Sequence, residues 1–179
     1  MATTGIWKIS ERLDNVITYT TNVEKTINNG YSKEPYCNLH NVIDYAEDDY
    51  KTEKQCFVSG INCSPQTVLK EMMITKNQYA KPGGILGFHA FQSFKEGEVT
   101  PELAHKIGIK LAEEMWGDRF EVVVSTHLNT NHIHNHFVIN SISFVDGKRY
   151  YDKRESYAEL RRLSDQLCNC LLYTSDAAD

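Results

Sequence analysis

The chain has 179 residues, of which 41% are hydrophobic, 24% are charged and 11% are aromatic. This composition excludes disorder as the main state, and the length suits a single domain. The formal net charge of -5 argues against a protein that coats nucleic acid by overall charge, but it allows a local basic groove. The sequence has no apolar run of roughly 18 residues and no signal-peptide pattern, so we expect a soluble, cytoplasmic protein without membrane insertion.

The cysteines and the C-terminal end carry little chemistry. Five cysteines without a CxxC pair predict neither a disulfide framework nor a cysteine zinc site. Residues 171–179 (LLYTSDAAD) do not continue the amphipathic pattern before them and resemble translated sequencing-adapter DNA. We therefore expect a natural domain over residues 1–170, as the N-terminal part of a longer protein, and a non-native tail over 171–179. A genuine acidic tail is the alternative.

The first half of the chain alternates short strands with helical segments. Apolar alternation predicts a strand over Gly5–Ile9, and apolar spacing predicts one or two helical turns over Leu13–Thr20. Residues 20–50 are typical of a long, partly helical surface excursion. Gln55–Ile61 is a further predicted strand, and Ser64-Pro65 begins a helix that runs to about residue 79.

The second half has the clearest elements. We predict strands over Ile85–Phe94, Phe120–Thr126 and His132–Phe144, a helix from Thr100 to Gly117, a turn at Asp146-Gly147 and a final helix capped by Ser156. Short connections between strands, with helices among them, favour an α+β fold in which helices flank an antiparallel-rich central sheet.

Four of the seven histidines lie within the segment HLNTNHIHNH, as His127, His132, His134 and His136. Along a strand the last three project from one face at intervals of roughly 6 to 7 Å. Two histidines spaced two apart, with a third from the preceding strand end, can surround one ion, and we expect His127, His134 and His136 to do so. A row of histidines without metal is the alternative.

The expected ligand set restricts the metal. Imidazole nitrogens suit Zn²⁺, Cu²⁺, Ni²⁺ or Fe²⁺, while a phosphate oxygen as an added ligand makes Mg²⁺ or Mn²⁺ acceptable. We expect Mg²⁺ or Mn²⁺ to be the ion in use, with Zn²⁺, Ni²⁺ or Cu²⁺ able to occupy the site. Three protein ligands leave coordination positions of the ion open for water or a phosphate oxygen, and an open site favours a catalytic role.

Three ordered motifs resemble those of relaxases, the plasmid and transposon mobilisation nucleases of the HUH endonuclease superfamily. His127, His134 and His136 followed by FVIN are similar to the third motif, GFHAFQSF to the second, and NVITYTTNVEKT to the first. The resemblance spans about residues 4–151. It implies an HUH-like fold and metal-dependent, strand-specific nicking and strand transfer at a transfer origin for conjugative mobilisation.

The resemblance implies that Tyr19 is the nucleophile, and Tyr31 or Tyr36 is the alternative. A 5′-phosphotyrosyl link would conserve the bond energy for rejoining. A phenol has a pKa near 10, so the nucleophile needs a base, for which His132, His89 or a bound hydroxide qualifies. His89 is also a candidate for support beside the metal.

The resemblance also implies partners and contacts. Single-stranded DNA is the expected substrate, with accessory relaxosome proteins and a coupling protein as further partners. His89 and Ser93 are expected DNA contacts near the cut. A basic set with two tyrosines for stacking is expected to line a groove: Lys76, Lys81, Lys148, Arg149, Lys153, Arg154, Arg161, Arg162, Tyr150 and Tyr151.

Asn129 and Asn131 stand where many relatives carry acids, and an amide cannot take up a proton, so a base role there is in doubt. We expect His40 and His105 to be surface residues. Three alternatives to the relaxase function are a rolling-circle initiator or transposase of the same superfamily, a non-catalytic histidine-rich metal module, and a zinc hydrolase of small phosphoesters.

Overall fold

The structure, a computed structural model, describes residues 2–26 and 57–176. Residues 27–50 of the predicted surface excursion, with Tyr31, Tyr36 and His40, lie outside the described residues. Five strands form one sheet in the order β1-β3-β5-β4-β2, and each neighbouring pair is antiparallel. Their bounds are β1 Thr3–Ile9, β2 Val58–Ile61, β3 Gly87–Ser93, β4 Val122–His127 and β5 His134–Asn140.

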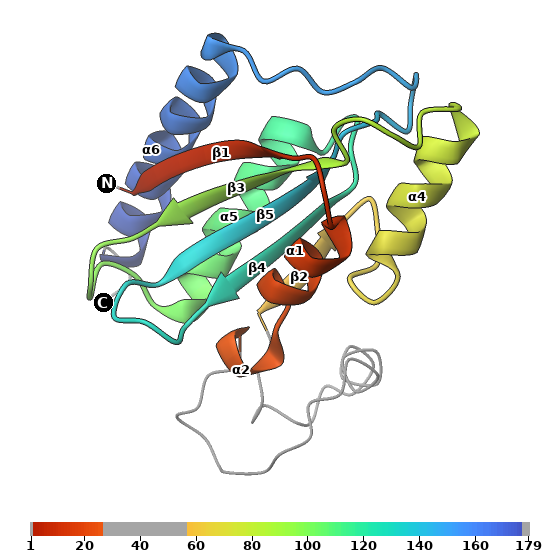
Figure 1. Ribbon diagram of the computed structural model, residues 1–179. Coiled ribbons are helices and arrows are strands. Elements are labelled where there is room, and N and C mark those ends of the chain that lie inside the picture. The colour runs from red at the N-terminus through yellow and green to blue at the C-terminus, as the bar shows by residue number, and fades with distance from the viewer. Residues whose placement is uncertain (1, 27–56, 177–179) are drawn as a thin grey trace.

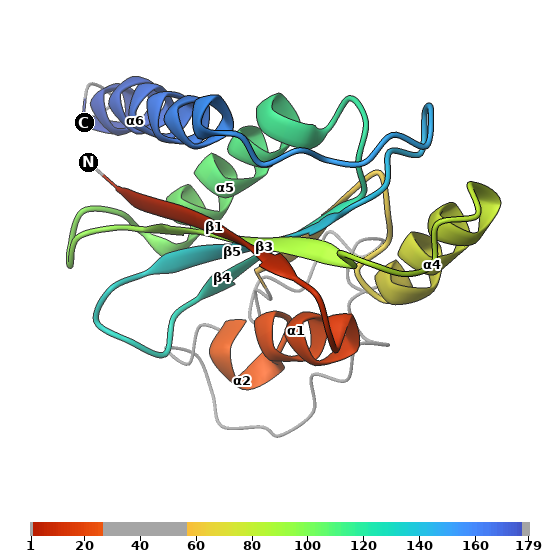
Figure 2. The same cartoon turned by 45° about the horizontal axis from the view of Figure 1, so that its top comes forward.

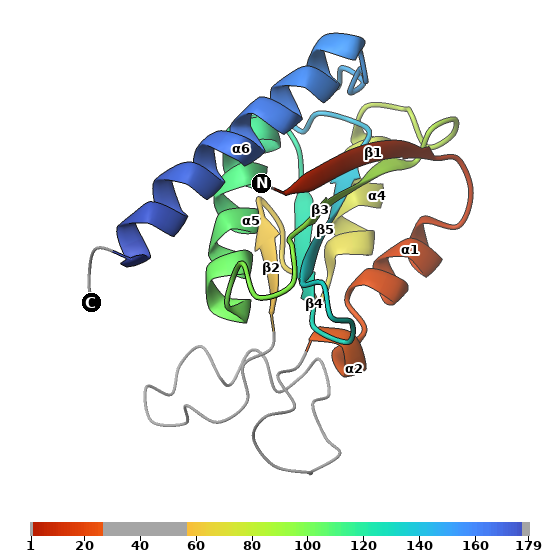
Figure 3. The same ribbon diagram turned by 90° about the vertical axis from the view of Figure 1, so that its left-hand side faces the viewer.

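Helices cover both faces of this sheet (Figures 1 and 2). Helices α5 and α6 lie on one face, and α1, α2 and α4 lie on the other, as the view along the sheet in Figure 3 shows. Their bounds are α1 Leu13–Thr20, α2 Val23–Thr26, α4 Val68–Gln78, α5 Pro101–Trp116 and α6 Arg154–Asp176. The predicted α+β fold with a central antiparallel sheet is confirmed.

Helix α5 packs its apolar face into the larger of the two core clusters of the described residues. Its N-terminus is capped by Thr100, whose side chain accepts a hydrogen bond from the Leu103 amide, and a proline occupies the first turn. Ile107 and Leu111, in the middle of its apolar stripe, are fully buried in the core, while Leu103 and Met115 are partly buried. The ring of Trp116 lies 5.6 Å from that of Phe137 on β5. The apolar periodicity therefore predicted both the helix and its buried face.

Several boundaries differ from the prediction by a few residues, among them the end of β5 and the beginning of α6. Strand β5 ends at Asn140 rather than at residue 144, because the chain turns back and Ile142 forms a bridge with Arg149 across the predicted Asp146-Gly147 turn. Helix α6 begins at Arg154, so Ser156 lies inside its first turn and donates its hydroxyl hydrogen bond back to the Tyr151 carbonyl at 3.3 Å. The same helix continues past residue 170 to Asp176.

A buried polar network fixes β5 on the α5 side of the sheet. The Asn135 amide donates to Gln92 Oε1 at 2.9 Å and to the Ala104 carbonyl at 2.7 Å, and its oxygen accepts from Thr126 Oγ1 at 2.7 Å. Asn135 lies between two of the clustered histidines in the sequence, and its side chain points to the opposite face. Because a one-residue slip would exchange the faces, this network holds the register that the histidine face requires.

Candidate metal centre

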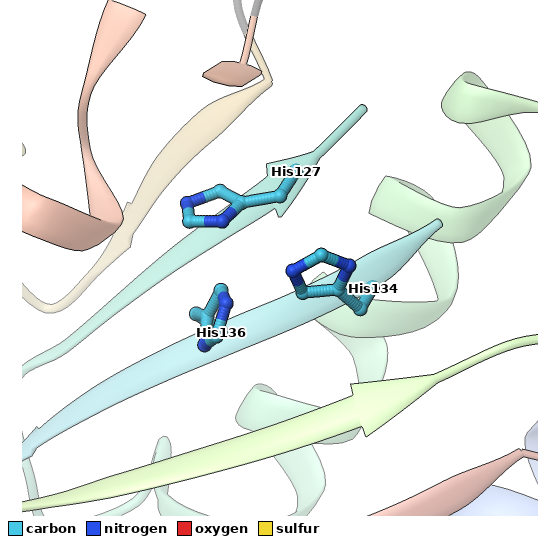
Figure 4. Close-up of side chains that lie close together, drawn as sticks. All are labelled: His127, His134 and His136. Atoms are coloured by element: carbon cyan, nitrogen blue, oxygen red, sulfur yellow. The ribbon is translucent and has the colours of Figure 1, made fainter. Parts of the chain in front are cut away.

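Three histidines converge on the face that α1 and α2 partly cover (Figure 4). His127 ends β4, while His134 and His136 lie two residues apart on β5, and the register pairs His127 with His134. One nitrogen from each ring lies within 4.8 Å of the other two. The strand alternation predicted this cluster, and the spacing of its nitrogens suits a single metal ion.

The hydrogen bonds of the three rings leave one nitrogen on each available. A carbonyl oxygen only accepts, so His127 Nε2 donates to Thr20 at 2.8 Å and His134 Nδ1 donates to His132 at 2.8 Å. His136 Nδ1 is paired with His89 Nε2 at 2.8 Å, and His136 Nε2 is buried without a hydrogen-bond partner. An unpaired buried nitrogen is costly, and a metal ion would satisfy it, so the donor set fits a metal.

Burial disfavours the charged form of His89, His127 and His136. Burial first, and the neighbouring histidines second, lower the pKa of His89 and His127 to about 4 and that of His136 to about 2. The positive charge of Lys25 acts in the same direction on His127 and His136. A neutral imidazole is the form that binds metal, so the lowered pKa values of His127 and His136 favour binding of a cation.

The lowered pKa values predict acid-sensitive folding. Between about pH 6.5 and pH 4 the unfolded chain takes up protons that folded His89, His105 and His127 do not, so the free energy of unfolding falls as the pH falls. Each group contributes up to about 1.4 kcal/mol per pH unit. Urea unfolding at pH 7 and pH 5, with a chelator present, measures this. His105→Gln should flatten the dependence by one group, whereas equal stability at both pH values would contradict the account.

Tyr19 stands over the histidine cluster at the end of α1. Its ring centroid lies 5.7 Å from that of His127 and 6.1 Å from that of His136, and the Lys25 ammonium lies 3.3 Å from its ring centre. The α1–α2 corner is held there because the Lys25 carbonyl accepts a hydrogen bond from the Leu128 amide at 2.7 Å. The tyrosine side chain is 51% exposed, so a ligand can reach it.

The remaining predicted residues on this side lie along β3 and the loop before β5. His89 is buried and bonded to His136, while Ser93 is half-buried and pairs in register with His134. His132 is exposed, with Nδ1 3.3 Å from the Phe94 carbonyl. Both β3 side chains therefore adjoin the cluster, and His132 lies at its outer edge.

Lys148 and Arg149 lie away from the cluster. They follow the C-terminal end of β5, whereas the histidines occupy its first half. Lys148 pairs with Asp146 at 3.3 Å, and Arg149 donates to the Gly83 carbonyl at 3.1 Å. The structure thus does not bring these two basic residues together with the metal ligands.

Three expectations for surface residues are wrong. Lys76 is fully buried and donates to Asn140, beside the buried carboxylate of Glu121, so it cannot line a groove. Tyr150 is half-buried, with its ring 4.8 Å from that of Phe88 and 5.5 Å from that of Phe120. His105 is half-buried rather than a surface residue, and it is hydrogen-bonded to Ser59 and Thr126 at 2.8 Å each. Apolar periodicity gives no signal for the polar contacts of Lys76 and His105.

Comparison with known proteins shows the family of the chain. The family model for the relaxase MobA/VirD2-like nuclease domain matches residues 45–170, which include β3 and all three clustered histidines. The chain belongs to this relaxase family. The matched range begins after Tyr19, so it does not bear on the proposed nucleophile.

Individual relaxases are also similar to this chain in sequence. Protein rlx of Staphylococcus aureus is 36% identical over 126 residues, 70% of this chain and 36% of its own length. The group II intron-interrupted relaxase LtrB of Lactococcus lactis is 32% identical over 146 residues, 78% of this chain and 25% of its own. The chain therefore spans about a third of the length of the first of these relatives.

A solved structure also has a similar fold. A structure concerned with the molecular basis of vancomycin resistance transfer in Staphylococcus aureus has a TM-score of 0.62 at 10% identity. The match covers 98% of this chain and 94% of that one. Within the described ranges, no helix combines the length and apolar character needed to cross a membrane.

Proposed function

We propose that this chain is the catalytic domain of a mobilisation relaxase that nicks one DNA strand at a transfer origin and holds it through a 5′-phosphotyrosyl link to Tyr19. The observation that carries the proposal is the convergence of His127, His134 and His136 beneath the exposed Tyr19 ring. Membership of the relaxase family supports the nicking activity. The substrate is single-stranded DNA, and relaxosome proteins and a coupling protein in the cytoplasm are its partners.

The three histidines would hold a divalent ion, Mg²⁺ or Mn²⁺ in use, that polarises the scissile phosphate and neutralises its charge. In the chemical step, the Tyr19 phenolic oxygen attacks phosphorus as its proton passes to a base. The bond from phosphorus to the 3′ oxygen breaks, and that oxygen leaves as a free 3′-hydroxyl after protonation. The reverse reaction rejoins the strand.

The surroundings suggest different roles for the two further histidines. His89 is buried and uses Nε2 on His136, which suits a residue that orients a ligand. His132 is exposed, and its role as the base for Tyr19 remains a proposal. A His132→Gln variant that forms adduct at the wild-type rate would remove that role.

DNA contacts are proposed at two places. Ser93, in register with His134, would contact the backbone near the cut. Lys148 and Arg149, at the far end of β5, would contact a more distant part of the strand. Their separation from the cluster supports a role in strand binding rather than in the chemical step.

Lys25 is expected to hold the nucleophile. Its ammonium lies over the Tyr19 ring, where it orients the ring and favours negative charge at the reacting oxygen and phosphate. Lys25→Met should slow adduct formation by about tenfold, while Lys25→Arg should retain most of the rate because guanidinium also stacks on aromatic rings. Single-turnover rates on a denaturing gel measure this, and an unchanged rate in Lys25→Met would refute the role.

The proposed function is tested by incubating the protein with Mn²⁺ and a pool of single-stranded oligonucleotides. A denaturing gel should reveal a covalent protein–DNA adduct that chelator prevents. The proposal would be contradicted if the folded, metal-loaded protein formed no adduct, either with the pool or with oligonucleotides that carry the transfer origins of its staphylococcal relatives. That result would favour the non-catalytic metal module.

A further inference from the structure

Trp7 is an exposed aromatic residue on the histidine face of the sheet. It pairs in register with His89 across β1 and β3, so its side chain projects on the same side as the cluster. Its ring centroid lies 4.4 Å from that of His89, edge to face, and 5.9 Å from that of Phe91. The residue nevertheless remains 45% exposed.

The histidine cluster lies between two exposed rings. Tyr19 contacts His127 and His136 from the α1 side, whereas Trp7 contacts His89, which is hydrogen-bonded to His136. One ring contact and one hydrogen bond therefore join Trp7 to a metal ligand. Because β1 is an edge strand, the side of Trp7 away from the cluster has no further strand beside it in this sheet.

A glycine helps to shape this surface. Gly5 pairs with Phe91 across β1 and β3, and a Cβ on Gly5 would lie 2.5 Å from the Phe91 ring. The ring therefore lies over bare backbone beside Trp7. Phe91 is half-buried, so the two rings form an aromatic shelf next to the cluster.

We propose that Trp7 stacks against a base of the bound strand, adjacent to the phosphate held at the histidine cluster. This inference rests on the proposed function, because it takes single-stranded DNA as the ligand. Lys25 and a cation held by the three histidines would attract the anionic backbone, and a strand anchored there would lay its neighbouring bases over the sheet face. Stacking on an indole ring is tolerant of sequence, since every base has a π-face.

The fluorescence of Trp7 can be used to follow the binding of a strand. The chain has two tryptophans, and Trp116 is fully buried in the core. A stacked base should quench the Trp7 emission and leave the Trp116 emission unchanged. Tyr19→Phe protein loaded with Mn²⁺ allows binding to be followed without cleavage.

The test compares oligothymidylate of about twelve nucleotides with an abasic strand of equal length, which keeps the phosphates and lacks the bases. With intact Trp7, oligothymidylate should quench the emission and bind about tenfold more tightly than the abasic strand. Trp7→Ala should bind both strands with equal affinity, and Trp7→Phe should recover part of the difference. Mn²⁺ affinity and the Trp116 emission of each variant check the cluster and the fold.

Equal affinity of the Trp7-containing protein for the two strands would overturn the proposal, as would a preference for oligothymidylate that survives in Trp7→Ala. Quenching that persists when wild-type protein forms no covalent adduct would support the stacking site while contradicting the nicking function. Absence of binding to both strands would overturn the stacking site, whereas the nicking function is decided by the adduct.

Discussion

Tyr19→Phe is expected to abolish the covalent protein–DNA adduct. The substitution removes only the phenolic oxygen, so nothing remains at that position to bond to phosphorus, and the adduct should fall to background. The ring contacts with His127 and His136 are kept because phenylalanine preserves the ring. A denaturing gel after incubation with Mn²⁺ and the oligonucleotide pool measures the effect.

Metal affinity and thermal stability of Tyr19→Phe should equal those of the wild type, since the hydroxyl is on an exposed side chain. If the adduct persisted at the wild-type level, the relaxase chemistry would stand and the nucleophile would lie elsewhere. Tyr31 and Tyr36 would then be the residues to replace next.

His136→Asn is expected to lower the affinity for Mn²⁺ by more than about 100-fold. The asparagine amide can take the place of Nδ1 and keep a hydrogen bond with His89, while the unpaired Nε2 is lost. Two ligands then remain on the cluster, and adduct formation should fall with metal occupancy. Isothermal titration with Mn²⁺, beside circular dichroism to verify the fold, measures the change.

His132→Asn is the matched control for metal affinity, because it removes an exposed histidine of the same segment that is outside the three-nitrogen cluster. Its Mn²⁺ affinity should match the wild type. Equal losses in His132→Asn and His136→Asn, or no loss in either, would contradict the assignment of the ligand set.

Most of the fold was predictable because the apolar patterns are strong. Helix α5 has an apolar stripe and a capping threonine, and β4 begins with three consecutive valines. The end of β5 was not predictable from alternation, because the reversal after Asn140 depends on pairing between Ile142 and Arg149. The beginning of α6 was misplaced because Ser156 suits a cap, yet its hydroxyl bonds back to Tyr151 from within the first turn.

The site was predictable to the extent that it follows strand alternation. The spacing of His127, His134 and His136 indicated a cluster, and the structure brings their nitrogens together. The contact between His89 and His136 crosses two strands that are distant in sequence, so no local pattern reveals it. The same holds for the burial of Lys76, which depends on its hydrogen bond to Asn140 across the fold.

The most direct test of Tyr19 as the nucleophile is to identify the amino acid that carries the DNA. The adduct formed with Mn²⁺ would be digested with protease and nuclease, and the peptide that retains a nucleotide would be sequenced by mass spectrometry. We expect a single modified peptide, with the 5′-phosphate on the phenolic oxygen of Tyr19. A nucleotide on any other residue, or a cut strand with no protein attached, would contradict it.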